Sequence, residues 1–405
     1  MSARMHRHAL TEADLRDACL RVASRSGIDA IGIPQIAVEA GVTSAPVYRR
    51  FDSADDLIAD LWASTLRDRW RRAARTAISS SADHADAADT AWLHGEILTP
   101  SAESTMALEA LCIARRLGPA GSSIRTDVEF DLGTMLADAA HVPPVLALAS
   151  ITPLLGAWLI GPLAPHYATS VVATFGRFGE EYRRTEHWAL ESADIPYVPP
   201  PQLRAGTGEA ALDDLRWAVI LSVSQFGVAN TTTNRVARRA GRSLNTAYRR
   251  LGSKDELIAE AIDMALSGDF GFTGSENAAS MPFSRQDRLE RALHVLRNHI
   301  DDRNHLHRSF LLEALLAARH HDTVRRSVVE WIGRVDERFA SELAGRPAAD
   351  LVRITDQWRY RIASGLGSLV LSLLSSLYAH RYDPMPAISA HDAVVTAGSK
   401  SRSRR

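Results

Sequence analysis

The sequence predicts an all-α protein. Apolar residues recur three and four positions apart through most of the 405 residues, which is the spacing of amphipathic helices. No segment has the alternation of apolar and polar residues that indicates a half-buried β-strand. A pattern of two short helices joined by a glycine turn also occurs at 232–251 and, in weaker form, at 32–51. We therefore expect a helical fold that contains this unit twice.

An internal repeat relates residues 14–60 to residues 214–260. Aligned without a gap, seventeen of the 47 positions are identical, including Ala-Gly at 40–41 and Tyr-Arg-Arg at 48–50. The period is much longer than the roughly 20–50 residues of solenoid repeats. The repeat therefore indicates duplication of a whole smaller protein.

The first helix of each copy has a clear apolar stripe and a glycine at its end. In the first copy the helix ends near Gly27, and its inward residues are Leu15, Ala18, Cys19, Val22 and Ala23. The second helix begins after Gly32 with Pro34 in its first turn, where the missing N–H is harmless. In the second copy Thr232 takes the place of Gly32 and is the better N-cap.

The turn before the third helix requires a left-handed backbone, which Gly41 and Gly241 can adopt. Thr43 and Ser243 are expected to cap the third helix. Its inner face is expected to consist of Val47, Tyr48 and Phe51. A fourth helix opens at Ser53 with acidic residues in its first turn, which favour the helix dipole, and continues to residue 66.

Longer helical patterns follow each copy. They are expected at 86–98, 102–117, 123–140, 144–161 and 168–190, and then at 284–302, 304–319, 321–344 and 347–380. Segments rich in Pro, Gly, Ser or Asp separate them at 79–86, 195–208 and 267–281. The resulting domains are a first head (1–60), a first body (61–195), a linker (196–211), a second head (212–260), a second body (261–382) and a basic tail (383–405).

An uncharged stretch at 139–176 resembles a membrane segment. It contains no Asp, Glu, Lys or Arg, but five prolines leave no run of about 20 apolar residues. We therefore expect a helix buried between packed units. The first residues lack the apolar core of a signal peptide, and Cys19 and Cys112 form no disulfide framework, so a cytoplasmic protein is expected.

Catalytic and metal-binding motifs are missing from the sequence. There is no phosphate loop, nucleophile elbow, HExxH or CxxC pattern. Six histidines crowd residues 294–321, but no cysteine or close acidic partner joins them. We expect no catalytic residue, no bound metal and no cofactor, and therefore a protein that is not an enzyme.

The two copies match a known helix-turn-helix pattern. Residues 36–58 read I-A-x-E-A-G-V-T-x-x-x-V-Y-R-R-F-x-S-x-D-D-L-I, and residues 236–258 read V-A-R-R-A-G-R-S-L-N-T-A-Y-R-R-L-G-S-K-D-E-L-I. Both resemble the TetR family of bacterial transcriptional regulators. The resemblance implies, for each half, a DNA-binding head and an α-helical body for ligand binding and dimerisation. It also implies a repressor that a small hydrophobic effector releases from DNA.

The resemblance carries over to single residues. It implies that Tyr48 and Tyr248 pack in the recognition helix and touch a phosphate, and that Lys254 contacts the DNA backbone. Ala54 stands at the lysine's place in the first copy. The residues expected to contact DNA are Thr232, Arg242, Ser243, Leu244, Asn245, Thr246, Tyr248, Arg249 and Lys254 in the second copy, and Thr43, Ser44, Ala45, Pro46, Tyr48 and Arg49 in the first. The side chain of Asn245 could form paired hydrogen bonds with adenine, and that of Arg242 could read guanine.

Charge distinguishes the two copies. Residues 34–56 carry a net charge of −2, whereas residues 234–256 carry +5. Because phosphate neutralisation supplies most non-specific DNA affinity, the second copy is predicted to dominate binding.

The halves are expected to pair within one chain. The uncharged segments 144–162 and 362–378 occupy comparable late positions and could bury each other, although each could also pack inside its own half. A covalent pseudo-dimer of this kind would read an asymmetric operator in double-stranded DNA, and association of two chains stays open. The alternative is a ligand-binding or interaction protein in which one helix-turn-helix no longer binds DNA.

Overall fold

The computed structural model describes residues 11–82, 85–139, 141–184, 209–245, 253–267, 305–343, 347–375 and 378. All regular secondary structure within these ranges is helical, which confirms the predicted class. Most of the predicted linker (196–211) and of the predicted loop (267–281) lies outside the described residues, as do the predicted helix at 284–302 and the tail from 383.

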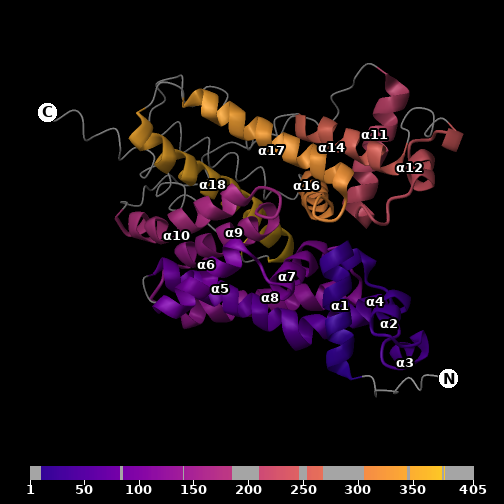
Figure 1. Ribbon diagram of the computed structural model, residues 1–405, viewed down its shortest axis with the longest axis horizontal. Coiled ribbons are helices and arrows are strands. Elements are labelled where there is room, and N and C mark those ends of the chain that lie inside the picture. The colour runs from indigo at the N-terminus through magenta and orange to yellow at the C-terminus, as the bar shows by residue number, and fades with distance from the viewer. Residues whose placement is uncertain are drawn as a thin grey trace, which may run out of the picture.

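The described helices follow the chain through two halves. Those of the first half are α1 (Glu12–Ser26), η1 (Ile28–Ala30), α2 (Ile33–Glu39), α3 (Ser44–Tyr48), α4 (Ala54–Leu61), η2 (Trp62–Leu66), α5 (Arg67–Ser81), α6 (Ala87–Leu98), α7 (Ala102–Ile113), α8 (Pro119–Asp138), α9 (Pro144–Ile160) and α10 (Pro165–Arg184). Those of the second half are α11 (Ala210–Phe226), α12 (Thr233–Arg239), α14 (Lys254–Ser267), α16 (His305–Ala317), α17 (Asp322–Glu342) and α18 (Ala348–Leu374). Figure 1 shows the first half below and the second above, with α9 and α18 between them.

The first head consists of α1 to α4. All five apolar positions predicted for α1 are buried, and Gly27 ends this helix with φ 81°. The second helix carries Pro34 in its first turn, as expected. Ser53 caps α4 because its Oγ accepts a hydrogen bond from the backbone N–H of Asp56 at 3.1 Å.

The second head repeats this arrangement with α11, α12 and α14. Gly227 ends α11 with φ 78°, as Gly27 ends α1. Thr232 caps α12, since its Oγ1 accepts from the backbone N–H of Arg235 at 3.2 Å. Residues 246–252, which include most of the predicted third helix, lie outside the described part of the chain.

Two predictions for α3 were wrong. Thr43 occupies the N-cap position but makes no side-chain cap hydrogen bond, and its exposed hydroxyl group is left to solvent. Tyr48 does not belong to the inner face, because its side chain is 53% exposed. A helix of five residues offers only one narrow buried stripe. Val47 fills it, and Phe51 packs at its edge.

The fourth helix runs on beyond Leu66 without a break. It passes from α4 through a single π-helical turn, η2, into α5 and ends at Ser81. Buried residues occur every fourth position along this run, at Ile58, Trp62, Leu66, Trp70 and Ala74. Steps of four drift by about 40° each around a helix of 3.6 residues per turn. The wider π turn reduces this drift and keeps the apolar stripe on the core.

The uncharged stretch forms the buried centre of the molecule. Every residue of α9 from Leu146 to Ile160 is buried, and α9 packs most extensively against α18. The two backbones come close at glycines: a Cβ on Gly156 would lie 1.7 Å from the Ala363 carbonyl oxygen, and one on Gly367 would lie 1.8 Å from that of Thr152. No helix in the described ranges is both long and apolar enough to cross a membrane.

Candidate nucleic-acid interface

The helix-turn-helix of the first head is held by a glycine turn. Gly41 adopts φ 69°, in the left-handed region that favours glycine. Its N–H donates to the carbonyl oxygen of Val38 at 3.1 Å, and the N–H of Val42 donates to that of Ala37 at 2.9 Å. These two bonds satisfy the last carbonyl groups of α2 and set the direction of α3.

The second head has the same turn. Gly241 adopts φ 64°. Its N–H donates to the carbonyl oxygen of Arg238 at 3.2 Å, and the N–H of Arg242 donates to that of Ala237 at 2.9 Å. The equivalent distances in the two heads therefore agree within 0.1 Å.

The DNA-facing residues predicted for the first head lie together on its surface around α3. Thr43, Ala45, Tyr48 and Arg49 are exposed, and Ser44 and Pro46 are half-buried. The exposed tyrosine is free to reach a phosphate. Val38, on the outer side of α2, is 81% exposed, so this head presents an apolar side chain beside the predicted contact surface.

Glu39 of the first head is neutralised within the head. Its carboxylate accepts hydrogen bonds from Arg21 Nε at 2.7 Å and from Arg25 Nη2. The bonds from Arg25 and Arg21 lower the pKa of this half-buried carboxyl group. The two arginines are therefore engaged by α2, which leaves Arg49 and Arg50 as exposed cations near the predicted DNA surface.

Apart from Lys254, which is half-buried, the predicted contact residues of the second head are exposed where the structure describes them. These are Thr232, Arg242, Ser243, Leu244 and Asn245. Thr246, Tyr248 and Arg249 lie outside the described residues.

Several arginines of the second head are bound to the head itself. Arg242 Nη2 lies 2.7 Å from Asp214 Oδ2. The guanidinium of Arg235 stacks on the Phe226 ring, 4.2 Å from its centroid. Arg239 Nη2 donates to Gln225 Oε1 at 2.6 Å.

Lys254 is anchored at the corner between α11 and α12. Its ammonium group donates to the carbonyl oxygen of Ala229 at 3.1 Å. Burial lowers the pKa of Lys254, and the neighbouring Asp255 opposes that shift. The lysine therefore joins the start of α14 to the corner before the helix-turn-helix.

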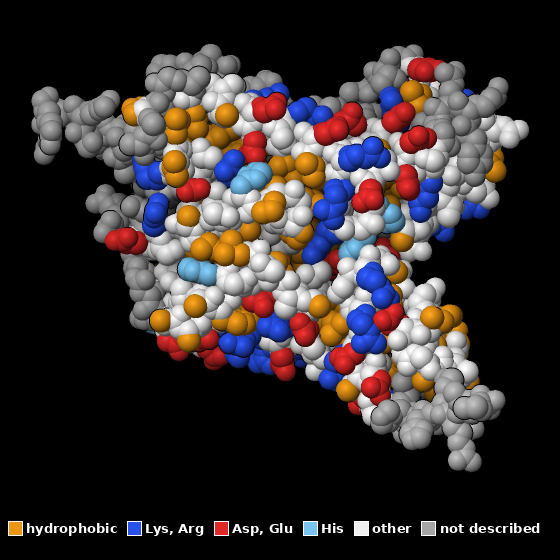
Figure 2. Space-filling view, viewed as in Figure 1, with side chains coloured by type: hydrophobic (Ala, Val, Ile, Leu, Met, Phe, Trp, Pro, Cys, Tyr) orange, Lys and Arg blue, Asp and Glu red, His pale blue; other side chains and the backbone are white. Residues whose placement is uncertain are grey.

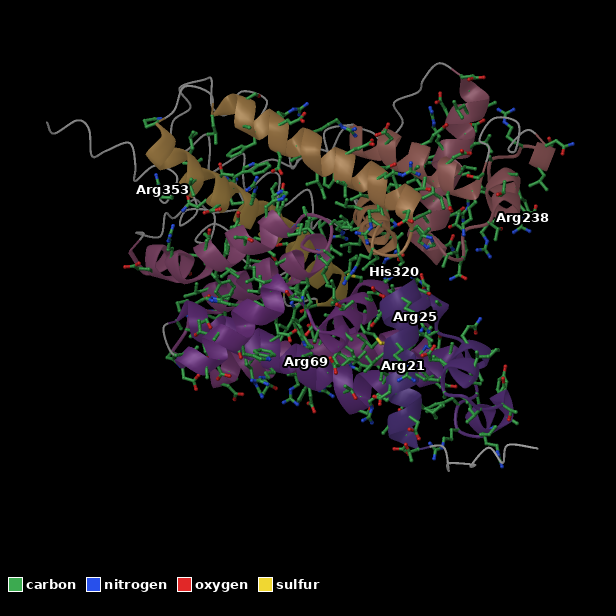
Figure 3. All side chains as sticks on the ribbon, in the orientation of Figure 1. Arg21, Arg25, Arg69, Arg238, His320 and Arg353 are labelled. Atoms are coloured by element: carbon green, nitrogen blue, oxygen red, sulfur yellow. The ribbon has the colours of Figure 1, made fainter. Side chains whose placement is uncertain are left out.

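The two heads lie at the same end of the molecule. In Figure 1, α2 and α3 lie at the lower right and α12 at the upper right. The space-filling view shows them as separate lobes on that side (Figure 2). Arg238 extends outward from α12, while Arg21 and Arg25 lie along α1 (Figure 3).

Three partners of these residues were not predicted from the sequence. Asp214, Gln225 and Ala229 lie 28, 14 and 25 residues, respectively, from the groups they bind. Neither a motif nor a helical period joins positions at such separations. The polarity of the α1–α2 contact could have indicated one of them, because Arg25 and Glu39 are replaced by Gln225 and Arg239 at equivalent positions.

Comparison with known proteins bears on the first head. Residues 15–61 match the family model described as bacterial regulatory proteins, tetR family. A comparison with curated proteins finds no match. The match covers α1 through α4 and includes the glycine turn described above. Together with the exposed surface of α3, it supports a DNA-binding transcriptional regulator of the tetR family.

Proposed function

We propose that the chain is a covalent pseudo-dimer that binds an asymmetric DNA operator and represses transcription until a small hydrophobic effector releases it. The observation that carries this proposal is the same glycine turn, with the same two hydrogen bonds, built twice in one chain. Two-headed regulators of this type read half-sites one DNA turn apart, about 34–36 Å. One chain with two heads can meet that requirement alone.

Contacts between the halves support pairing within the chain. Gly156 meets Ala363, and Gly367 meets Thr152. Thr152 precedes Gly156 by four residues, as Ala363 precedes Gly367, so each half offers the same pair of positions to the other. Reciprocal contact of this kind characterises a two-fold symmetric dimer interface.

The difference in charge supports an asymmetric operator. The second head carries Arg242, Arg238 and Lys254 where the first carries Val42, Val38 and Ala54. A head with fewer cations neutralises fewer phosphates, so it binds more weakly and with a smaller salt dependence. The second head therefore contributes most of the affinity, and the two recognition helices prefer different bases.

The experiment compares operator binding by variants of the two heads. Using DNA from upstream of the reading frame, Arg242→Ala combined with Lys254→Ala should weaken binding about tenfold to a hundredfold. The slope of log affinity against log salt should fall by about 1 for each bound phosphate that a substitution frees. Arg49→Ala, the control in the first head, should have a smaller effect. A larger effect of Arg49→Ala would contradict the proposed asymmetry.

A footprint tests the pseudo-dimer. We expect a non-palindromic site occupied by one chain. A perfect palindrome occupied by two chains would contradict pairing within the chain.

A second function is favoured by the first head's surface. The exposed Val38, the half-buried Ala54 and the net charge of −2 are poor for phosphate binding. In this alternative the first head is an interaction module, and the chain binds DNA only through the second. Unchanged affinity when the bases under the first head are randomised would favour the alternative.

In either case we propose a cytoplasmic protein without catalytic activity. The effector would bind in a helical body, as the resemblance to the family implies. A mass spectrum of small molecules retained by the purified protein would identify the effector, and its addition should release the DNA.

A further inference from the structure

One arginine joins the first head to the body of the second half. Arg116 follows α7, and its Nη1 and Nη2 each donate to a carboxylate oxygen of Asp29 at 2.7 Å. Its Nε and Nη2 donate to Glu313 of α16 at 2.8 and 3.3 Å. Asp29 lies in η1, the corner between α1 and α2 of the first head. A single guanidinium group therefore makes paired bonds to the first head and to the second half.

This contact is buried, and the positive charge of Arg116 is paired with carboxylates. The Arg116 and Glu313 side chains are 9% and 3% exposed. Burial acts to lower the pKa of Arg116, but the charge of Glu313 and the bonds to Asp29 outweigh it and raise the pKa. Glu313 also accepts from Arg115 Nη2 at 2.8 Å. Paired bonds of a buried guanidinium to carboxylates fix geometry as well as charge.

A second set of bonds holds the same corner. Glu109 of α7 accepts from the backbone N–H of Ile28 at 2.8 Å. Its other oxygen lies 2.9 Å from His320 Nε2, which belongs to the second half. Figure 3 shows His320 between α16 and α1. The corner of the first head is thus held from both halves.

The two halves use equivalent positions for this junction. Residues 109–115 read E-A-L-C-I-A-R, and residues 313–319 read E-A-L-L-A-A-R. Glu109 and Glu313 each receive a side chain from the opposite half, His320 and Arg116 respectively. The arginine that ends each motif crosses the junction as well, since Arg115 donates to Glu313 and Arg319 donates to Thr105 Oγ1 at 3.2 Å.

The symmetry fails at the corner of the second head. Ala229 stands where the first head has Asp29, so no carboxylate is offered there. Among the described residues, this end of the second head offers neutral groups to its neighbours. Lys254 donates to the Ala229 carbonyl oxygen, Arg115 Nη1 donates to the Ser224 carbonyl oxygen, and Ser224 Oγ donates to the Leu306 carbonyl oxygen. Arg116 also packs against Gly227. Each of the three hydrogen bonds ends on a backbone carbonyl group and is weaker than a paired bond between a guanidinium and a carboxylate.

We propose that Arg116 is a positioning residue that fixes the first head to the junction of the halves, so that the second head takes up differences in half-site spacing. This inference rests on the proposed two-headed DNA binding. Asp29 and Glu313 are the carboxylates through which Arg116 acts. The replacement of Asp29 by Ala229 makes the second head the adjustable one.

Distances between spin labels in the full-length protein test this proposal without DNA. The equivalent exposed positions Val38→Cys and Arg238→Cys are each paired with Val329→Cys on α17. Cys19 and Cys112 are buried, and burial raises the pKa of the Cys19 thiol to about 12, so both stay unlabelled. We expect a narrower distance distribution for the first head than for the second.

Substitutions then assign the difference to the ion pairs. Asp29→Asn should broaden the first-head distribution to the width of the second-head distribution. Arg116→Lys, which keeps the charge but loses the paired bonds, should broaden it as well. Asp17→Asn, an exposed carboxylate of α1, is the control and should change nothing. Equal widths in the unmodified heads, or no broadening by Asp29→Asn in folded protein, would overturn the proposal.

Operators with base pairs inserted between the half-sites complete the test. The distance between the labels at Arg238→Cys and Val329→Cys should shift with half-site spacing. The distance between the labels at Val38→Cys and Val329→Cys should stay constant. A shift confined to the first head would overturn the proposal. If no DNA is bound at all, the proposed function fails, whereas the DNA-free distance widths still decide the role of Arg116.

Discussion

At the scale of single residues, equivalent positions in the two heads keep a contact while exchanging its chemistry. Arg25 of α1 donates to Glu39 of α2 in the first head. In the second head the donor is Arg239 of α12 and the acceptor is Gln225 of α11. The contact between the two helices is thus retained, but the arginine lies on the first helix of the first head and on the second helix of the second head. The change from Glu39 to Arg239 accounts for two of the seven charge units by which residues 34–56 and residues 234–256 differ.

The N-caps of the second helix and third helix provide a prediction at this scale. Thr232→Ala removes the bond from Thr232 Oγ1 to the Arg235 N–H and should lower the free energy of unfolding by about 0.5–2 kcal/mol. Thr43→Ala is the matched control, because Thr43 makes no cap bond, and should change it by less than about 0.5 kcal/mol. Urea denaturation followed by circular dichroism measures both. Equal losses would show that the Thr232 bond does not stabilise α12.

At the scale of elements, the run from α4 to α5 connects the first head to its body. At its π turn, Trp62 Nε1 donates to Asp127 of α8 at 3.1 Å. Just beyond it, Arg67 makes paired bonds to Asp131 at 2.9 and 2.8 Å and reaches Asp127 at 2.7 Å. The bonds to Asp131, whose side chain is fully buried, raise the pKa of Arg67. Helix α8 therefore holds the head–body connection at two points.

We expect Arg67→Ala to destabilise this connection. It leaves buried Asp131 with Arg71 Nε at 3.6 Å as a charged neighbour, so the free energy of unfolding should fall by about 1–3 kcal/mol. Arg75→Ala, about two helical turns further along α5, breaks an exposed pair with Asp138 at 3.5 Å and should cost less than about 1 kcal/mol. The comparison uses urea denaturation at one salt concentration. A loss for Arg75→Ala as large as that for Arg67→Ala would contradict the role of burial.

At the scale of the whole molecule, the halves meet at small residues on α9 and α18. Neither Gly156 nor Gly367 adopts an unusual backbone, since both lie inside helices. Their importance is the close approach of the opposing helix backbone. A larger side chain at either position must push the halves apart.

Gly156→Ala and Gly367→Ala should each lower the free energy of unfolding by about 1–3 kcal/mol, because the added methyl group overlaps a carbonyl oxygen. Gly133→Ala in α8 is the matched control: nothing lies within 4 Å of its added Cβ, so it should gain roughly 0.5–1 kcal/mol. The measurement is again urea denaturation. Stabilisation by Gly156→Ala would show that α9 and α18 do not meet as closely as described.

Most elements of the fold could be predicted from the sequence because their causes are local. Gly27, Gly41 and Gly241 end helices or form turns through their own backbone freedom. The period of apolar residues located the described helices of both heads and α9, with errors of a few residues at the ends. The π turn was missed because it corrects a drift that depends on which face the core covers.

The candidate site was predictable only in part. The sequence determined the glycine turn of each head and the difference in charge between residues 34–56 and 234–256, since these depend on residue types at short spacing. Only the tertiary structure decided that Tyr48 is exposed and that Arg242 pairs with Asp214. It also decided that Arg116 joins Asp29 to Glu313, which lie 87 and 197 residues away along the chain. Paired charges at such separations leave no period in a sequence, because only packing brings them together.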